Sequence, residues 1–385
     1  MDEQTRLIHA GEAPKELAKT VGPPIQKGST VLLPDARALY DDHHRVTYGR
    51  QGLAAHVALR EALAVLEGAV GVALYPSGIA AITGPLLQLL AAGDEILVVD
   101  TIYKPTRRFC DLVLKRFGVA TTYYDAATPP EQLVAEASDK VRLILMESPG
   151  SLSFEMQDVA RIAALAKARG ILTAIDNTWG AGLIYKPLEH GVDISIQALT
   201  KYVGGHSDVF MGSAAARDPA LVRALDDSVL HVGWAVSPED AYAMLRGLRT
   251  LPTRMARHGE SGLAVARWLA GQPEVVQVLH PALPGAPGHE LWKRDYSGAC
   301  GLFGFVLRPA PRAAVEAFLD ALAIFGLGFS WGGFESLAID CDPQLKSRSF
   351  RHDYGGPLIR LHIGLEAADD LMADLRVALD AYAAA

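Results

Sequence analysis

Between residues 54 and 201 the sequence alternates apolar, strand-like runs with amphipathic helical runs. The strand-like runs end near residues 74, 99, 124, 146 and 175, and a helical pattern separates each from the next. Because these runs are almost continuously apolar, we expect parallel strands that helices cover on both faces. The pattern predicts an α/β fold with a large parallel sheet. It also places any ligand at the carboxyl ends of the strands.

A lysine in the loop after a buried strand is the most informative residue at that edge. Ile194, Ile196 and Ala198 alternate as in a short strand, and Lys201 follows them, ahead of the turn Gly204-Gly205. Burial disfavours an ammonium group, so the pKa of Lys201 should fall and leave a nucleophilic amine. A loop lysine taken alone is more often solvated. The prediction therefore depends on its neighbours at this edge.

Three other strand ends carry residues that suit one common ligand. Ser77-Gly78-Ile79 opens a helix directly after a strand, where free N–H groups and the helix dipole favour an anion. Asp176 ends another strand and needs a cationic partner if it is buried. Tyr103 follows a third strand and offers an aromatic face. Taken alone, the three are more simply interpreted as a helix cap, a turn residue and a half-buried aromatic ring. Together with Lys201, they are the groups needed to hold pyridoxal 5′-phosphate (PLP).

Several motifs of the chain resemble the Cys/Met-metabolism family of PLP enzymes. The resemblance runs in order from about Thr5 to the last helix and implies PLP fold type I, like aspartate aminotransferase. It implies a large PLP-binding domain at 51–245, with a mainly parallel, seven-stranded type of sheet, and a smaller C-terminal α/β domain at 246–385. The chain is most similar to the bacterial members that cleave cystathionine by β-elimination. The motifs are Tyr75-Pro76-Ser77-Gly78, Thr101-Ile102-Tyr103-Lys104-Pro105, Glu147-Ser148-Pro149-Gly150-Ser151, Asp176-Asn177-Thr178-Trp179, Thr200-Lys201-Tyr202, Ser330-Trp331-Gly332-Gly333-Phe334-Glu335-Ser336-Leu337 and Leu358-Ile359-Arg360-Leu361-His362.

The resemblance implies a role for each cofactor-binding residue. Lys201 would form the Schiff base with PLP and shuttle a proton, Asp176 would pair with the ring nitrogen, and Tyr103 would stack on the ring. The backbone N–H groups of Gly78 and Ile79 would hold the phosphate.

The phosphate site is expected to draw on two further parts of the chain. The Thr200 hydroxyl would join it, although many relatives also have Ser where this chain has Ala198. Residues 1–50 are rich in Gly and Pro and predict an extended arm that reaches a neighbouring subunit. Tyr48 and Arg50 at the end of this arm would complete the phosphate site across a dimer interface. A homotetramer, built as a dimer of dimers, follows from the resemblance.

The substrate side is also assigned by resemblance. Arg360 would clamp the substrate α-carboxylate, a task that suits the paired donors of guanidinium. Ser330 and Trp331 would line the pocket with Tyr48, and Lys201 or a phenolate of Tyr48 or Tyr103 would take the first proton. The γ-eliminating relatives usually have Leu at the position of Trp331, so this residue favours β-elimination to homocysteine, pyruvate and ammonia. A core aromatic is the ordinary alternative for Trp331.

The sequence leaves other functions open. The chain could be a cystathionine γ-lyase, a γ-synthase or a methionine γ-lyase of the same family. A cofactor-free Schiff-base lyase that uses Lys201 is a candidate of another class, and a binding role could be added to the lyase activity.

Composition excludes several classes of protein. The 385 residues are 50% hydrophobic, enough for two domains, yet no run of 18 apolar residues predicts a membrane span. The net charge of −8 comes without a basic stripe, which argues against nucleic acid as a partner. Cys110, Cys300 and Cys341 are widely spaced and predict reduced thiols in a cytoplasmic protein. The pair His43-His44 lacks a metal-binding spacing, so no metal site is predicted.

Overall fold

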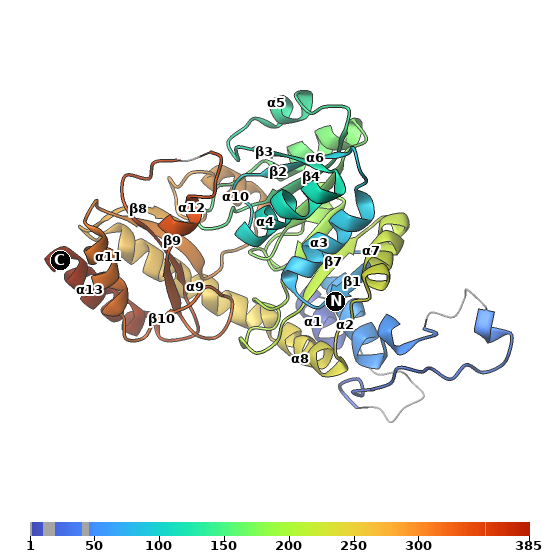
Figure 1. Ribbon diagram of the computed structural model, residues 1–385. Helices are drawn as coiled ribbons and strands as arrows, with labels where there is room; N and C mark the ends of the chain where they lie inside the picture. The colour runs from blue at the N-terminus through green and yellow to red at the C-terminus, as the bar shows by residue number, and fades with distance from the viewer. Residues whose placement is uncertain (1, 11–19, 41–45, 351) are drawn as a thin grey trace.

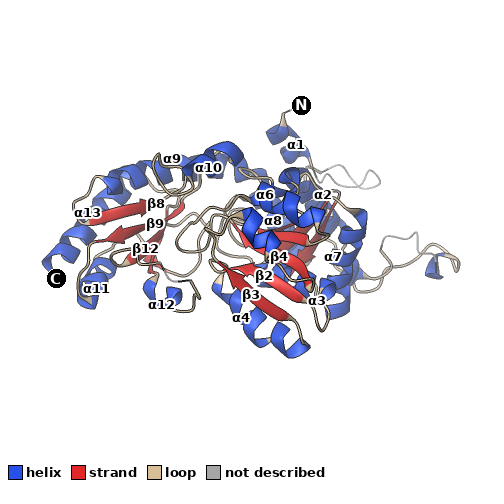
Figure 2. Ribbon diagram, turned by 90° about the horizontal axis from the view of Figure 1, so that it is seen from above, coloured by secondary structure: helices blue, strands red, loops and turns tan. Residues whose placement is uncertain are grey.

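The computed structural model describes residues 2–10, 20–40, 46–350 and 352–385. It contains two sheets, each with its own helices, which lie side by side in two perpendicular views (Figures 1 and 2). The larger sheet belongs to the first two thirds of the chain and the smaller one to the last third.

The large sheet has seven strands in the order β1-β7-β6-β5-β4-β2-β3. Strand β7 pairs antiparallel with β1 and β6, whereas the other pairs are parallel. The sheet is therefore mainly parallel, as the family resemblance implies. Strand β7 is antiparallel because residues 198–211 return from β6 without the crossover that a parallel pair requires. The strands are β1 (Gly71–Tyr75), β2 (Glu95–Val99), β3 (Ala120–Tyr124), β4 (Val141–Glu147), β5 (Leu172–Asp176), β6 (Ile194–Gln197) and β7 (Gly212–Ala216).

Helices connect and cover these strands as the apolar patterns predict. Most begin at a capping side chain or at a proline in the first turn, where no intrahelical N–H bond is needed. The helices are α2 (Ala54–Glu67), α3 (Gly78–Leu89), α4 (Lys104–Leu112), α5 (Pro130–Ala135), α6 (Val159–Ala168), α7 (Pro219–Val232) and α8 (Pro238–Arg249).

Around the expected domain boundary the chain is almost continuously helical. Helices α8 and α9 (Leu251–Ala270) meet at Thr250, and Pro252 is tolerated because it stands in the first turn of α9. Helix α9 then runs from the large domain onto the small sheet (Figure 1). The domain boundary expected near residue 245 falls within α8 and stays a prediction.

The small sheet has five strands in the order β10-β11-β12-β9-β8. The family resemblance implies a smaller α/β domain here without giving its strands. Its elements are β8 (Val275–Leu279), α10 (His289–Asp295), β9 (Leu302–Leu307), α11 (Arg312–Asp320), β10 (Gly326–Leu327), β11 (Leu337–Asp340), α12 (Asp342–Leu345), β12 (Leu358–His362) and α13 (Ala368–Ala384).

Two apolar cores stabilise the fold. One lies around the large sheet, and the other is formed by β9, β12 and the inner faces of α9, α11 and α13. Small-domain residues such as Tyr296, Leu302 and Leu358 belong to the first core. The two domains therefore share a packed interface, which fixes the loops between them.

The N-terminal segment lies largely away from this body. After α1 (Glu3–His9), the described part of residues 20–53 extends from the large domain and carries the short helices η1 (Ala38–Tyr40) and η2 (Gly49–Gln51) (Figure 1). Leu32 and Tyr40 are each 92% exposed. Large apolar side chains this exposed are what an arm that packs on another protein surface would carry.

Within the described residues, no helix is both long and apolar enough to cross a membrane.

Candidate active site

Most of the predicted site residues meet in one cavity of about 420 Å³ at the carboxyl edge of the large sheet. Both domains contribute to its wall. The predicted residues that line it are Gly78, Ile79, Tyr103, Asp176, Thr200, Lys201, Ser330, Trp331 and Arg360. A second cavity of about 880 Å³ adjoins it and shares Tyr103, Lys201, Trp331 and Arg360. The site therefore opens into a wider cleft between the domains.

Lys201 has the environment expected of a nucleophilic amine. Its Nζ donates a hydrogen bond of 2.9 Å to Ser330 Oγ and lies 5.3 Å from the Trp331 ring centroid. Burial and the nearby Arg360 lower the pKa of Lys201 to about 8, while Asp176 acts in the opposite direction. A measurable fraction of the amine is therefore neutral near pH 7.

Asp176 is held at the end of β5 by the residue two positions on. Its Oδ1 accepts a 3.0 Å hydrogen bond from Thr178 N and a second from the Thr178 hydroxyl. Burial raises the pKa of Asp176, whereas the two Thr178 hydrogen bonds and the charge of Lys201 act to lower it. No described residue donates to its Oδ2, so one oxygen remains for a cation such as a protonated ring nitrogen.

Tyr103 precedes α4, is 45% exposed and lines both the cavity and the cleft. Its backbone N donates a 2.7 Å hydrogen bond to Oε2 of Glu147, and Glu147 Oε1 accepts from the Ser151 hydroxyl. Burial, followed by Asp176 and Glu147, raises the pKa of Tyr103. The tyrosine is thus a neutral phenol that Glu147 fixes through the main chain.

The start of α3 lines the same cavity as Lys201 and has the features that favour an anion. Ser77 caps the helix by accepting from Ala80 N at 3.2 Å, and no described residue accepts from the N–H groups of Gly78 and Ile79. A Cβ at Gly78 would collide with the Cβ of Ala198, so this close approach of loop and helix requires glycine. Free amides at a helix start fit one phosphate group.

The Thr200 hydroxyl lines the cavity but is already engaged. It donates to Met211 O at 3.1 Å and accepts from Met211 N at 3.0 Å. It would have to rotate to donate to a phosphate, so its expected phosphate contact stays a prediction.

Arg360 stands on β12 and reaches into the site from the small domain. Its Nη2 donates to the carbonyl oxygens of Phe329 and Ser330 at 3.1 Å each. Its Nε is buried and has no hydrogen-bond partner among the described residues. A buried donor of this kind is costly unless a ligand accepts from it, and a carboxylate fits.

Trp331 takes part in both packing and the cavity wall. Its ring meets that of Tyr202 edge-on, with centroids 5.4 Å apart, and it borders both cavities. The two expected roles, core aromatic and pocket wall, are therefore not exclusive.

Tyr48 and Arg50 are not brought to this cavity within one chain. Tyr48 is 48% exposed before η2, and Arg50 donates to Leu230 O of α7 at 3.0 Å. Their expected contribution from a neighbouring subunit stays a prediction. The pair His43-His44 lies outside the described residues.

Other site residues were given no role by the sequence reasoning. Glu147 stands out in the sequence only as part of a strand-end motif, and its link to Tyr103 is set by the fold. Phe329 on the loop after β10, and Phe210 before β7, also line the cavity. Both are largely exposed. No periodic pattern in the sequence marks either loop, so no signal indicated them.

The arrangement fits PLP. Free amides at Gly78 and Ile79 suit its phosphate, the free oxygen of Asp176 suits its ring nitrogen, and the Lys201 amine suits its aldehyde. The residues present therefore fit this cofactor, and the unpartnered Nε of Arg360 fits a carboxylate beside it.

Known proteins are similar to this chain over nearly its whole length. A putative cystathionine β-lyase from Rhizobium johnstonii is 47% identical, with 96% of this chain and 94% of that protein covered. The cystathionine β-lyase MetC of Escherichia coli is 39% identical, with 96% of each chain covered.

A crystal structure of cystathionine γ-lyase from Lactobacillus plantarum, complexed with L-serine, superposes with a TM-score of 0.90 at 30% identity over the full length of both chains. These likenesses confirm the predicted fold class, PLP dependence and lyase class. Residues 4–380 match the model of the Cys/Met metabolism PLP-dependent enzymes, and the chain belongs to this family.

Proposed function

We propose that this protein cleaves L-cystathionine and related cysteine thioethers by β-elimination. The observation that carries the proposal is the meeting of Lys201, Arg360 and the Ser330-Trp331 loop in one cavity. The reaction adds one water to cystathionine and yields homocysteine, pyruvate and ammonia. The cystathionine β-lyases that are 39–47% identical to this chain support the choice of reaction.

Lys201 is the best candidate to move the proton. Its amine would take the proton from the substrate Cα, and a pKa near 8 keeps part of it neutral at physiological pH. Tyr103 is a weaker candidate, because burial and two carboxylates raise its pKa. When bound, PLP supplies an electron sink that stabilises negative charge at Cα. The electron pair of the Cβ–S bond leaves with sulfur, which gains a proton to give the homocysteine thiol.

Arg360 would orient the substrate. Its buried, unpartnered Nε supports an ion pair with the α-carboxylate, and its two bonds to carbonyl oxygens hold the side chain in place. A substrate held this way keeps Cα next to Lys201, and its thioether arm extends toward the cleft. The large volume of that cleft, about 880 Å³, supports a substrate with a long second arm.

The quaternary structure belongs to the same proposal. The exposed apolar side chains of the arm, Leu32 and Tyr40, support an arm that packs on a second copy of the chain. Tyr48 and Arg50 would then add to the phosphate site of that copy. Two such dimers would form the proposed homotetramer.

The keto-acid product tests the reaction. Purified protein with PLP and L-cystathionine should release pyruvate and homocysteine in equal amounts. Formation of 2-oxobutyrate and cysteine as the main products would refute β-elimination in favour of a γ-lyase.

Two variants test the assigned residues. Lys201→Ala should lose turnover, and Arg360→Gln should impair use of the amino acid while PLP stays bound. Arg312→Gln is the matched control, since Arg312 borders the adjoining cleft but pairs with Glu316 and Asp340. Full turnover by Lys201→Ala would contradict the proposal, and so would loss of PLP by Arg360→Gln.

The remaining alternatives are less well supported. The family match sets aside a lyase without cofactor. No described feature singles out a partner for an added binding role. The cytoplasmic location remains a proposal, which the three buried, free thiols support.

A further inference from the structure

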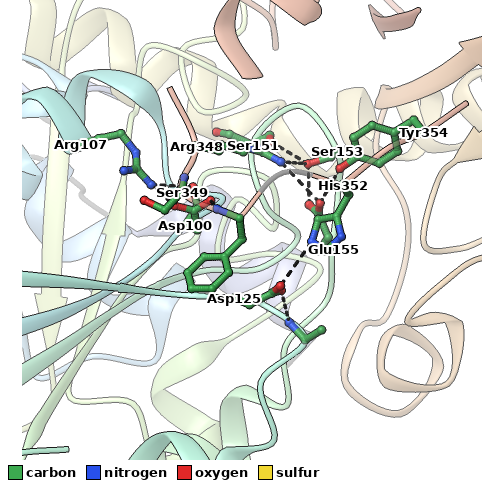
Figure 3. A network of polar contacts seen from close by, with 12 residues as sticks. Asp100, Arg107, Asp125, Ser151, Ser153, Glu155, Arg348, Ser349, His352 and Tyr354 are labelled. Carbon is green, nitrogen blue, oxygen red and sulfur yellow. Dashed lines mark hydrogen bonds and ion pairs between the residues drawn. The ribbon is translucent and has the colours of Figure 1, made fainter. Parts of the chain in front are cut away.

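A segment of the small domain, residues 347–350, crosses to the large domain beside the active site. It follows α12 and approaches the carboxyl end of β2 and the loop 150–155 (Figure 3). None of the proposed catalytic steps involves residues 347–350. Its contacts are nevertheless buried and mostly involve charged groups. Burying a charged group costs free energy unless that group has a hydrogen-bond or ion-pair partner.

Arg348 makes the contact with the loop 150–155. It is 9% exposed, and its Nη1 donates to Ser153 Oγ at 2.6 Å and approaches Glu155 Oε1 at 3.5 Å. Its Nη2 donates to the carbonyl oxygen of Ser151. Tyr354 adds a 2.8 Å hydrogen bond to Glu155 Oε1. One guanidinium from the small domain therefore holds both ends of this large-domain loop (Figure 3).

Asp100 anchors the residues that follow Arg348. It is 1% exposed and pairs with the similarly buried Arg107 of α4. Its two carboxylate oxygens accept from Ser349 N at 3.0 Å and from Phe350 N at 2.9 Å. Asp100 thus holds the backbone directly after Arg348. The Arg348 side chain therefore extends to the loop 150–155 from a fixed main chain.

The loop is in turn tied to the ring that faces the cofactor site. Ser151 donates its hydroxyl to Glu147 Oε1, and Oε2 of the same carboxylate accepts from Tyr103 N at 2.7 Å. Ser151 N also donates to Thr101 O at 2.9 Å. A continuous set of hydrogen bonds thus runs from Arg348 through Ser151 and Glu147 to Tyr103.

We propose that Arg348 is a positioning residue, which sets the place of Tyr103 through Ser151 and Glu147. The small domain thereby controls the aromatic face of the active site without itself contacting the reacting atoms. The inference rests on the proposed function only in placing the cofactor against Tyr103.

Hydrogen exchange of the apoprotein tests the chain of contacts without any cofactor. In Arg348→Gln, the amide of Tyr103 should exchange about tenfold faster. The variant loses the hydrogen bonds that support Ser151, which should lower the free energy of local opening at Tyr103 by roughly 1.4 kcal/mol. Amides in β5 and α13 should be unaffected. Faster exchange in loop 150–155 with no change at Tyr103 would overturn the inference.

Arg294→Gln is the matched control. Arg294 on α10 also bonds across to the large domain, with Asp158 Oδ1 at 2.7 Å, but it is more exposed and its other partner is Asp295 of its own helix. This variant should leave exchange at Tyr103 unchanged. Equal acceleration in both variants would mean general loosening between the domains and would overturn the inference.

The PLP-loaded enzyme gives a second readout. Arg348→Gln should alter the visible circular dichroism of the bound cofactor and lower kcat about tenfold, with KM changed by less than about twofold. Arg348→Lys, which keeps the charge, should recover part of kcat. A rise in KM alone would make Arg348 a substrate contact and refute its positioning role.

A double variant tests whether Ser151 lies on the path. Ser151→Ala removes the hydroxyl that reaches Glu147, so Arg348→Gln should have little further effect on kcat in its presence. Fully multiplicative losses would refute the path. The exchange experiment and pyruvate formation can fail independently, so the two proposals remain distinguishable.

Discussion

The amine of Lys201 should titrate near pH 8 in the apoprotein, far below an ordinary lysine. Burial is the main cause, Arg360 adds to it, and Asp176 opposes it. With a pKa of about 8, about a tenth of the amine is neutral at pH 7. An unperturbed lysine of pKa about 10.4 would be neutral in about 4 of 10,000 molecules, so the gain is roughly 200- to 300-fold.

Two substitutions should move this titration in opposite directions. Arg360→Gln removes a cation that disfavours the ammonium, so the pKa of Lys201 should rise and its reactive form should appear at higher pH. Asp176→Asn removes an anion that favours the ammonium, so the pKa should fall. Arg312→Gln, whose guanidinium is held by Asp340, should leave the midpoint in place.

Competitive labelling of the apoprotein measures this titration. A small neutral acylating reagent is used below saturation at pH 6 to 11, and mass spectrometry reports the labelling rate of the peptide that holds Lys201. Surface lysines in the same digest supply the ordinary titration near 10.4. A Lys201 midpoint at that ordinary value would refute the electrostatic reasoning, and so would a lower midpoint in Arg360→Gln.

Three further predictions address the phosphate site, the cleft and the arm. Ala198→Ser restores a hydroxyl on the cavity wall and should tighten PLP binding about three- to tenfold in equilibrium dialysis; unchanged or weaker binding would contradict this. Arg108 is exposed on the wall of the 880 Å³ cleft. Arg108→Ala should lower kcat/KM about two- to fivefold for cystathionine, but not for a thioether without a second carboxylate; equal losses would exclude a contact with the distal arm. Leu32→Ser with Tyr40→Ser should weaken self-association at least tenfold in sedimentation velocity, and an unchanged sedimentation coefficient would argue against a packed arm.

The large domain was predictable because its signals are local. Apolar runs such as Glu95–Val99 and Leu172–Asp176 are strands within about one residue of the predicted bounds. Strand β7 was missed because Gly212–Ala216 contains only Gly, Ser and Ala, which lack the β-branched or aromatic side chains typical of strands. Much of the small sheet was missed because its strands are separated by irregular loops.

The site was predictable where a residue stands at the end of a strand. Asp176 and Lys201 follow that rule, so the order of strands and helices in the sequence is enough to place them on one edge of the sheet. Arg360 lies inside β12 and was assigned only through the family resemblance. Arg348 lies in an irregular segment without periodicity, and its partners are about 200 residues away in sequence. Contacts of this kind depend on how the two domains pack, which no local pattern encodes.

The two carboxylates at neighbouring strand ends acquire different tasks from their hydrogen bonds. Glu147 and Asp176 are directly paired in the register of β4 and β5, and burial raises the pKa of both. Glu147 uses both oxygens on donors of its own chain, Tyr103 N and the Ser151 hydroxyl. Asp176 uses only Oδ1 in this way, so its Oδ2 is the oxygen that an incoming cation can reach. Since two adjacent buried carboxylates repel each other when both are ionised, a cation is most stabilised at the one with a free oxygen. Glu147 therefore orders the aromatic face of the site, while Asp176 is the carboxylate with an oxygen free for a cationic ring.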